Sequence, residues 1–307
     1  MSLTRRKFIA LGSFSSTVAL IGNSVQANPF QPQKQKNAPG FELLIMATNW
    51  GFDGDWEQFC AKIKKLGYDG AEAWYIHEAA GRKEFIEAFE RHNLKYGLLI
   101  GGSDANPNKH FEQFKRSLDG AVAMKPVYIN CHSGRDHFTF EQNKRFIVAT
   151  SDATQRTGVP IYHETHRSRM LYSAPVARHY IEAMPDLRLT LDISHWCNVH
   201  ESLLADQPDT VALALGRADH IHARVGHPEG PQVNDPRAPE WDDAVKAHLG
   251  WWDAVAGRKK SEGKMLTILT EFGPPHYLPA LPYTQQPVAS QWEINVHMLE
   301  ILRKRYA

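Results

Sequence analysis

The stretch that decides the fold class is residues 127–164, which read VYINCHSGRDHFTFEQNKRFIVATSDATQRTGVPIYHE. The apolar run over 127–132 predicts a buried strand, the amphipathic stretch 139–156 predicts a helix, and 159–164 predicts a second strand. A helix between two buried strands is typical of a βαβ unit, in which the two strands run parallel. Both strands end in polar residues.

The same unit recurs in both directions along the chain, at a spacing of about 30 residues. Strands are predicted over residues 41–47, 68–74, 94–100, 127–132, 159–164, 187–192, 220–225 and 265–271. Helices are predicted over residues 53–66, 82–92, from the third strand to 124, 139–156, 174–184, 201–215 and 289–303. Eight such units make one α/β domain, a single (β/α)8 TIM barrel of about 250 residues. A doubly wound open sheet is the rival, but it more naturally stops at five or six strands and no G-x-G-x-x-G or Walker loop follows a strand.

Composition agrees with a folded enzyme-sized domain and excludes several other classes. The chain has 307 residues, of which 42% are hydrophobic and 22% charged, which excludes wholesale disorder. Its 35 basic and 34 acidic residues nearly cancel, which argues against holding nucleic acid or an anionic membrane by bulk charge. Cys60, Cys131 and Cys197 are too few and too scattered for a disulfide framework, and no C-x-x-C is present.

The N-terminus predicts an export signal. Arg5 and Arg6 precede an apolar stretch over 8–21 that is too short to span a membrane, and a small-residue cleavage site follows at 25–27. This pattern is typical of a twin-arginine signal over 1–27, with a cytosolic amphipathic tail as the alternative. Removing those residues leaves 32 basic against 34 acidic residues, a net charge of −2. We therefore expect a flexible linker over 28–40, a barrel over 41–307, and a periplasmic or extracytoplasmic location.

Acidic and histidine residues gather where the later strands end. In a TIM barrel the carboxyl ends of the strands carry the chemistry, so these side chains are expected to meet at one mouth. The strand-end residues are Asn130, His132, His163, Glu164, His166, Asp192, His195, His222, Arg224 and Glu271.

Four of these residues predict a metal site. Glu164, Asp192, His222 and Glu271 supply three carboxylates and one imidazole. Such an oxygen-rich set suits Mn²⁺ or Mg²⁺, tolerates Co²⁺ or Zn²⁺, and leaves positions for a substrate's oxygens. Any one of the acids alone could be a helix cap or a surface charge. Four suitable residues on four successive strand ends instead favour one divalent cation.

With these residues the chain resembles the xylose-isomerase-like barrel superfamily, which includes ketose 3-epimerases, hydroxypyruvate isomerases and apurinic endonucleases. The resemblance covers the whole barrel, and it is most specific over 191–195, Leu-Asp-Ile-Ser-His, and over 220–222, His-Ile-His. It implies that Glu164, Asp192, His222 and Glu271 are metal ligands and that His195 contacts the substrate. His220 is the weaker ligand candidate, because strand alternation lets only one of the two histidines face a given layer of side chains at the end of the barrel.

These residues predict proton abstraction next to a sugar carbonyl. A divalent ion would stabilise the resulting enediolate, while Glu164 and Glu271 move protons on its two faces. Inversion at one carbon would give an epimerase, and transfer between carbons an isomerase. The same enolate could expel a substituent, so a lyase or hydratase acting on 3-keto-glycosides is the alternative. His166 stands where hydride-shifting aldose isomerases place a Lys, so true xylose isomerase activity is not expected.

Further side chains are expected to bind the substrate at the mouth. Three of them follow or end predicted strands, namely His132, His166 and His195. The fourth is Trp196, which is next to His195. Glu72 is expected to hydrogen-bond the substrate or a metal ligand, with a buried ion pair as the alternative.

Arginines and aromatic residues extend this list. Arg224 points the same way along its strand as His222 and is assigned to the mouth. Arg167 and Arg169 could hold a carboxylate or phosphate together with Arg224, or could form surface salt bridges. Trp74 ends the second strand and could stack on a sugar face. The Pro- and Gly-rich stretch 226–239 is expected to be a lid or binding loop.

Two rival functions remain at this stage. An apurinic endonuclease would need an Asp-x-His shortly after the seventh strand's histidine, and 226–239 contains none. A non-catalytic sugar-binding protein on a degraded barrel is the other rival. The expected partner is a small-molecule sugar or keto-sugar, with no nucleic acid and no stable membrane anchor, and a homo-oligomer is left open.

Overall fold

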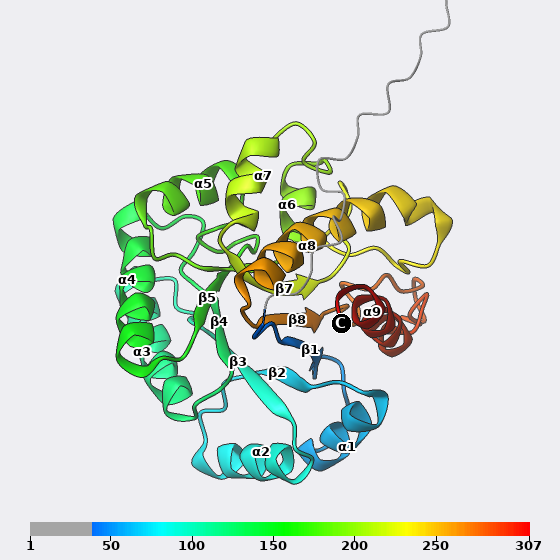
Figure 1. Ribbon diagram of the computed structural model, residues 1–307, viewed down its shortest axis with the longest axis horizontal. Coiled ribbons are helices and arrows are strands. Elements are labelled where there is room, and N and C mark those ends of the chain that lie inside the picture. The colour runs from blue at the N-terminus through cyan, green and yellow to red at the C-terminus, as the bar shows by residue number, and fades with distance from the viewer. Residues whose placement is uncertain (1–38) are drawn as a thin grey trace, which may run out of the picture.

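In the computed structural model, which describes residues 39–307, parallel strands form a closed barrel inside a layer of helices (Figure 1). The strands are β1 (Leu43–Thr48), β2 (Gly70–Trp74), β3 (Lys95–Gly101), β4 (Tyr128–His132), β5 (Ile161–Glu164), β6 (Leu189–Leu191), β7 (Ala218–Ala223) and β8 (Leu266–Thr270). Each strand pairs with its neighbour in chain order, and β1 closes the barrel on β8, where Leu43 lies opposite Leu266. The predicted single (β/α)8 TIM barrel is therefore confirmed.

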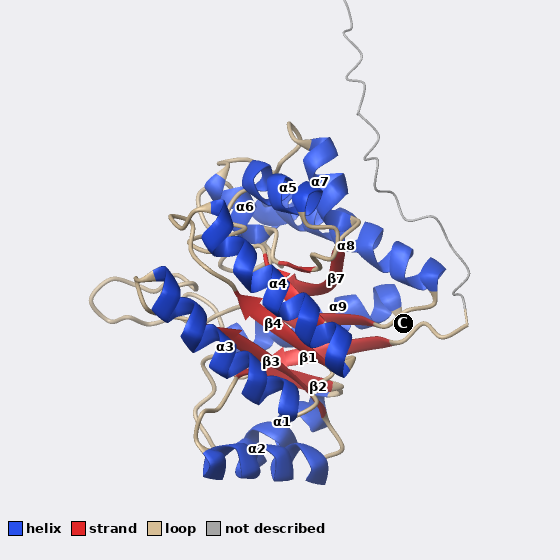
Figure 2. Ribbon diagram, turned by 90° about the vertical axis from the view of Figure 1, so that its left-hand side faces the viewer, coloured by secondary structure: helices blue, strands red, loops and turns tan. Residues whose placement is uncertain are grey.

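The helices pack on the outside of the barrel, as Figure 2 shows from the side. They are α1 (Trp56–Leu66), α2 (Ala79–Arg91), α3 (Pro107–Ala123), α4 (Phe140–Thr157), α5 (Ala174–Ala183), α6 (Ser194–Val199), α7 (Pro208–Leu215), the 3₁₀ turn η1 (Pro239–Trp241), α8 (Asp242–Glu262) and α9 (Gln291–Tyr306). Local sequence sets several of their ends. In α1, the Asp55 carboxylate accepts from the backbone N–H of Gln58, and Gly67 ends the helix at a φ of 87°.

Two helical segments differ from the sequence prediction. Of the helix predicted over 201–215, only α7 (from Pro208) is helical, and the short α6 directly after β6 was not predicted. Proline at the first position of α7 is compatible with a helix start and not with a helix interior, which explains the later beginning. The 21-residue α8 between β7 and β8 was not predicted. Its buried residues include the adjacent Trp251 and Trp252, so apolar side chains do not keep to one clear stripe.

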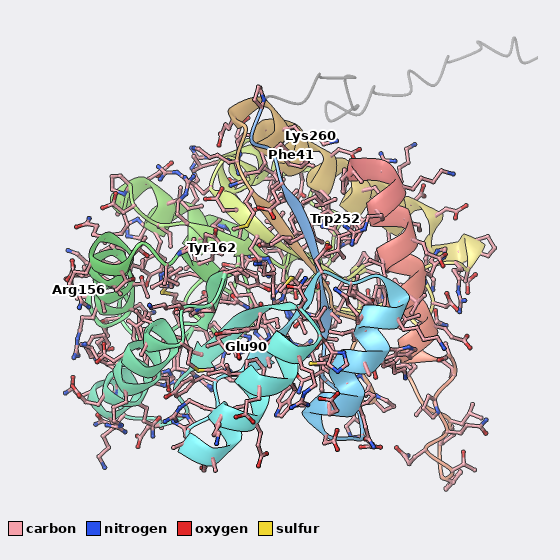
Figure 3. The ribbon with its side chains drawn as sticks, turned by 60° about the horizontal axis from the view of Figure 1, so that its bottom comes forward. Phe41, Glu90, Arg156, Tyr162, Trp252 and Lys260 are labelled. Carbon is pink, nitrogen blue, oxygen red and sulfur yellow. The ribbon has the colours of Figure 1, made fainter. Side chains whose placement is uncertain are left out.

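Two apolar layers hold the barrel together. The larger lies between the strands and the helices, where Phe59, Phe85 and Trp252 are among the buried side chains. Figure 3 shows how densely side chains fill this shell, with Trp252 among them. The smaller layer lies inside the barrel and consists of Leu44, Met46, Tyr128, Tyr162 and Leu269. This inner layer forms a floor, and the polar residues described below lie on its carboxyl-terminal side.

The predicted signal peptide over 1–27, and the predicted linker apart from residues 39 and 40, lie outside the described residues. Near the start of the described chain, the Lys260 ammonium lies 5.4 Å from the centre of the Phe41 ring (Figure 3). Among the helices of residues 39–307, none combines the length and the apolar character that crossing a membrane requires.

Candidate active site

Side chains that point into the barrel change from apolar to polar toward the carboxyl ends of the strands. Strand side chains alternate with a period of two, so every second residue points inward. On β4 the inward series begins with Tyr128 in the floor and continues with Asn130 and His132. On β7 the corresponding series is His220 and His222. The period of two thus places an apolar floor and a polar mouth on the same strands.

The four predicted metal ligands come together at this polar end. One ligand atom each from Asp192, His222 and Glu271 lies within 4.8 Å of the others. Glu164 and Asp192 approach each other within the same distance, and Glu164 Oε1 lies 3.8 Å from His222 Nδ1. We call Glu164, Asp192, His222 and Glu271 the ligand cluster. It draws on β5, β7 and the residues that directly follow β6 and β8.

Glu164 is buried and held by its neighbours on β4. Asn130 Nδ2 donates to Glu164 Oε2 at 2.7 Å, and His132 Nε2 lies 3.1 Å from the same oxygen. Burial alone would raise the pKa of Glu164, but the His132 and His222 imidazoles hold it well below its usual range. The carboxylate is therefore ionised, which is the form that binds a cation or accepts a proton.

Asp192 is fully buried and is tied to an arginine from the end of β7. The Arg224 guanidinium donates to Asp192, and the Ser194 hydroxyl donates to the other carboxylate oxygen. Arg224 Nη2 also lies 2.9 Å from His195 Nε2 and 3.5 Å from Glu271 Oε2. Burial raises the pKa of Asp192 to about 7; Arg224 opposes this shift, and Glu271 and Glu164 add to it. Arg224 is therefore positioned as the counter-charge of Asp192.

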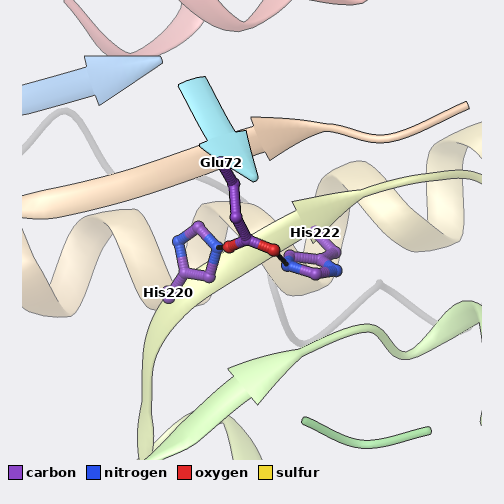
Figure 4. A group of neighbouring side chains, drawn as sticks. All are labelled: Glu72, His220 and His222. Atoms are coloured by element: carbon purple, nitrogen blue, oxygen red, sulfur yellow. Dashed lines mark ion pairs between the residues drawn. The ribbon is translucent and has the colours of Figure 1, made fainter. Parts of the chain in front are cut away.

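His222 lies between two sets of carboxylates. Its Nδ1 is 2.9 Å from Glu271 Oε2, and its Nε2 is 3.5 Å from Glu72 Oε1 (Figure 4). Burial would lower the pKa of His222, but Glu271, Glu164 and Glu72 raise it well above its usual value. The ring thus presents one nitrogen to the ligand cluster and the other to Glu72 beneath it.

Glu72 joins His222 to His220, one layer deeper in the barrel. Glu72 Oε2 lies 3.3 Å from His220 Nε2 (Figure 4). On its other side, His220 Nδ1 donates to the Thr267 carbonyl at 3.0 Å. Burial would raise the pKa of Glu72, but His222 and His220 lower it to about 2. Glu72 therefore contacts a predicted metal ligand, His222, through a buried ion pair, and its contact with the substrate stays a prediction. Both histidines face the barrel interior, but only His222 reaches the ligand cluster.

The ligand cluster fits a divalent cation. His222 Nδ1 and Glu271 Oε2 are buried and lie 2.9 Å apart, but neither atom has a hydrogen bond of good geometry within residues 39–307. Three carboxylates that converge on one imidazole in a buried site are a costly arrangement, which a bound cation would relieve. Three carboxylates and one imidazole match Mn²⁺ and Mg²⁺ best, with Co²⁺ and Zn²⁺ tolerated.

Replacing Glu72 with Gln is expected to weaken Mn²⁺ binding by about 10- to 100-fold, the range found when a residue that orients a metal-binding histidine is lost. Glutamine keeps the size of the side chain but no longer fixes which nitrogen of His222 carries the proton. Calorimetric titration with Mn²⁺ measures the change, and Glu90→Gln on the exposed face of α2 is the matched control. Equal affinity in the Glu72 variant would show that this carboxylate does not orient His222.

Three predicted substrate-binding histidines form an arc around the mouth. The ring centres of His132 and His166 are 4.6 Å apart, and those of His166 and His195 are 3.9 Å apart. Burial lowers the pKa of both His166 and His195 well below the usual value, so both rings are neutral. A neutral imidazole can both donate and accept a hydrogen bond, which suits the hydroxyl groups of a sugar.

The two tryptophans proposed for sugar stacking are placed very differently. Trp74 is 54% exposed, and its ring packs edge-on against His132 with centres 5.3 Å apart. Trp196 is 0% exposed, and its indole N–H donates to the Leu171 carbonyl at 2.9 Å. The prediction that Trp196 contacts the substrate is therefore wrong, because the side chain is part of the hydrophobic core.

Substitution of the two tryptophans separates these roles. We expect Trp196→Ala to lower the free energy of unfolding by about 3–5 kcal/mol, as for other large buried aromatics. Trp74→Ala is expected to leave stability nearly unchanged and to weaken sugar binding by about two- to tenfold. Urea unfolding and ligand titration measure the two effects, and a strongly destabilised Trp74→Ala protein would contradict the assignment.

Two residues at the site were not assigned a role from the sequence. Asn130 was recognised only as a strand-end residue, although it donates to Glu164. Tyr277 lies beyond β8, and its ring centre is 4.7 Å from the Arg224 guanidinium and 5.1 Å from that of Arg167. No spacing signal marks a loop tyrosine, whereas the inward position of Asn130 between Tyr128 and His132 could have revealed it.

The loop over 226–239 is packed against the ends of two strands. The buried Gln232 side chain donates to the Gly273 carbonyl at 3.1 Å and accepts from the Gly273 N–H at 2.7 Å. A Cβ atom at Gly226 would lie 2.7 Å from that of Ser194, so only glycine allows this approach. The loop thus packs against and stabilises the segments that contain Asp192 and Glu271. Its role as a lid or binding loop stays a prediction.

Solved structures with the same fold include three enzymes at low identity. The 3-keto-D-glucoside 4-epimerase from E. coli is 15% identical, with a TM-score of 0.56, and the match covers 86% of this chain and 100% of that chain. The D-allulose 3-epimerase from Methylomonas sp. is 14% identical, with a TM-score of 0.57 and coverage of 88% and 100%. The probable 3-DHS dehydratase from Bacillus anthracis is 13% identical, with a TM-score of 0.53 and coverage of 86% and 100%. At this identity the likeness establishes the fold alone.

A search of curated proteins found no match. The family model described as xylose isomerase-like TIM barrel matches residues 60–242, which is more than half of the chain. That segment contains β2 to β7 and three of the four residues of the ligand cluster. The chain belongs to the xylose isomerase-like TIM barrel family.

Proposed function

We propose that this protein is a divalent-metal-dependent sugar isomerase or epimerase that removes a proton next to a carbonyl. The observation that carries the proposal is the convergence of Glu164, Asp192, His222 and Glu271 in one buried cluster at the mouth of the barrel. Family membership and the shared fold of the solved epimerases support it.

The ligand cluster would hold one divalent ion through its three carboxylates and the Nδ1 atom of His222. When bound, such an ion supplies Lewis acidity that stabilises negative charge on two substrate oxygens. Glu164 is ionised and fixed by Asn130 and His132, so its carboxylate is rigid. Glu271 is the more open of the two glutamates, since 13% of its side chain is exposed against 1% for Glu164.

The two glutamates are the proposed acid–base pair. They come from β5 and from the end of β8, which are not neighbours in the barrel, so they approach a sugar from different directions. One carboxylate would take the proton from the carbon next to the carbonyl, and the other would return a proton. The neutral imidazoles of His166 and His195 would orient the sugar's hydroxyl groups. Arg224 would partly offset the effect of burial on the pKa of Asp192 and would hold that carboxylate in place.

A lyase or hydratase acting on a keto-sugar is the second candidate. It begins with the same proton removal, and the enolate then expels a substituent on the neighbouring carbon. The solved structures of this fold include both a 3-keto-D-glucoside 4-epimerase and a probable 3-DHS dehydratase, so the scaffold hosts both outcomes. The four-residue cluster serves either reaction, and the difference lies in which substituent leaves.

Deuterium incorporation tests the proposal and separates these reactions. Mn²⁺-loaded protein is incubated in heavy water with a panel of 3-keto-glucosides and free ketoses, and the products are followed by NMR. Incorporation of solvent deuterium at one inverted carbon identifies an epimerase, exchange with carbonyl migration an isomerase, and loss of a substituent a lyase. If no member of the panel exchanges or reacts while sugars still bind, the protein is a sugar-binding protein and the proposal is wrong.

We also propose that the protein is exported by the twin-arginine route and acts on a small-molecule sugar outside the cytoplasm. The support is the sequence over 1–27, with its paired arginines and small-residue cleavage site. Fractionation of cells that express the full chain tests this, with Arg5→Lys combined with Arg6→Lys as the comparison. Equal export of both forms would contradict the route.

A further inference from the structure

One arginine at the mouth forms no ion pair within the described residues. Arg169 follows β5, and its Nε and Nη1 atoms are buried without a hydrogen-bond partner. In the described part of the chain, its guanidinium forms no ion pair with any carboxylate, and its only polar contact is a 3.4 Å approach of Nη2 to His132 Nδ1. Most of its capacity to donate hydrogen bonds is therefore unused.

The surroundings of Arg169 make this arrangement unfavourable by themselves. Burial lowers the pKa of Arg169, and the positive charge of Arg135 lowers it further; the carboxylates of Glu164 and Asp136 oppose this shift, although neither forms an ion pair with the guanidinium. The guanidinium of Arg167, two residues earlier, has contacts of its own: it lies over the ring of Tyr277 and donates to Asn198 through Nη1 at 3.3 Å. Desolvated cations without an acceptor cost free energy, so a folded protein keeps such groups where a ligand supplies the missing charge.

We propose that Arg169 binds an anionic group of the substrate, a carboxylate or a phosphate. This inference rests on the proposed function and names its substrate class as acidic or phosphorylated sugars. An arginine fork is suited to both anions because it offers parallel N–H groups to two oxygens. Neutral sugar hydroxyl groups would leave the Arg169 guanidinium without an ion-pair partner.

The position of Arg169 also indicates which part of the substrate would carry the charge. His132 stands between Arg169 and Glu164: its Nδ1 faces Nη2 of Arg169, and its Nε2 faces Oε2 of Glu164. The anionic group would therefore lie one imidazole ring away from the carboxylate that handles the proton. The anionic group would therefore be attached to a carbon away from the reacting carbonyl. The sugar's hydroxyl groups would lie between the anionic group and that carbonyl.

Calorimetric titration of the Mn²⁺-loaded full chain tests the proposal with three probes: D-glucose, D-glucuronate and D-glucose 6-phosphate. We expect at least one anionic probe to bind about tenfold or more tightly than D-glucose, which is the scale of a charge-assisted arginine contact. D-glucuronate tests a carboxylate and D-glucose 6-phosphate tests a phosphate. The probe that binds more tightly identifies the anion. Equal affinity for all three probes would overturn the proposal.

Variants of Arg169 show whether this residue carries the preference. Arg169→Gln should bind the favoured anion no more tightly than D-glucose, and Arg169→Lys should recover only part of the preference because it lacks the fork. Arg116→Gln on the exposed face of α3 is the control and should bind as the unmodified protein does. An anion preference that persists in Arg169→Gln would assign it to the bound metal or to another arginine and would contradict the proposal.

Thermal unfolding without ligand supplies a second readout. Because Arg169 forms no ion pair, Arg169→Gln should melt at the same temperature as the unmodified protein or higher. A clear drop in melting temperature would mean that Arg169 has a structural role instead. The two proposals can fail independently. An anion preference without deuterium exchange would refute the proposed isomerase activity. Deuterium exchange on neutral sugars without an anion preference would refute only the role of Arg169.

Discussion

Replacing Glu271 with Gln is expected to abolish turnover while the barrel stays folded. The substitution removes one of the two proposed acid–base carboxylates and one negatively charged ligand atom, and it keeps the volume of the side chain. Loss of a general base alone typically costs about 10²- to 10⁴-fold in rate, and loss of a metal ligand adds to this. The side chain is partly exposed at the mouth, so removing its charge should not unfold the protein.

The measurement compares kcat of the two proteins on whichever substrate shows deuterium exchange, after circular dichroism has confirmed that both are folded. Glu300→Gln, on the exposed side of α9, is the matched control and should keep the unmodified rate. A Glu271→Gln protein with an unchanged rate would remove Glu271 from the mechanism, even if it still binds metal.

Addition of Mn²⁺ is expected to raise the melting temperature by about 10 °C relative to protein treated with a chelator. Without a metal ion, the carboxylates of Glu72, Glu164, Asp192 and Glu271 share the interior with few cations, chiefly His222 and Arg224. At a metal concentration about 1,000 times the dissociation constant, binding contributes about 4 kcal/mol to stability.

Scanning calorimetry with and without Mn²⁺ measures this stabilisation. Asp192→Asn should reduce the Mn²⁺ effect strongly, because it removes a charged ligand and leaves Arg224 without its partner. Glu300→Gln should show the full effect. Equal melting temperatures for the chelated and the Mn²⁺-treated protein would show that the cluster does not bind this ion.

Much of the fold could be predicted because the strand signal is local. Each strand is a short apolar run followed by polar residues, and eight such runs separated by amphipathic segments leave few architectures open. The α8 helix was missed for the converse reason. Its paired tryptophans and buried charged residues, such as Asp253 and Lys259, do not produce a clear apolar stripe.

Part of the site could also be read from the strand ends. Glu164, Asp192, His222 and Glu271 stand at corresponding places of four successive units, and the closed barrel brings them together. Residue type and spacing do not reveal burial, however. Trp196 follows His195 directly, yet a helix turns the two side chains in different directions, one toward Asp192 and the other into the core.

The pairing of charges was the least predictable feature. Arg224 was expected at the mouth, but its pairing with Asp192 depends on how far the end of β6 lies from the end of β7. Glu72 reaches His222 across the barrel from β2, a contact between residues 150 positions apart. Such contacts arise from the closure of the barrel, which no local pattern encodes.

The most direct test is a crystal structure of the protein grown with Mn²⁺, in which anomalous scattering locates the ion. We predict a single strong peak per chain, coordinated by Glu164, Asp192, Glu271 and the Nδ1 atom of His222. A peak between Glu72, His220 and His222 instead, or no peak at the mouth of the barrel, would contradict the proposed metal site and the chemistry built on it.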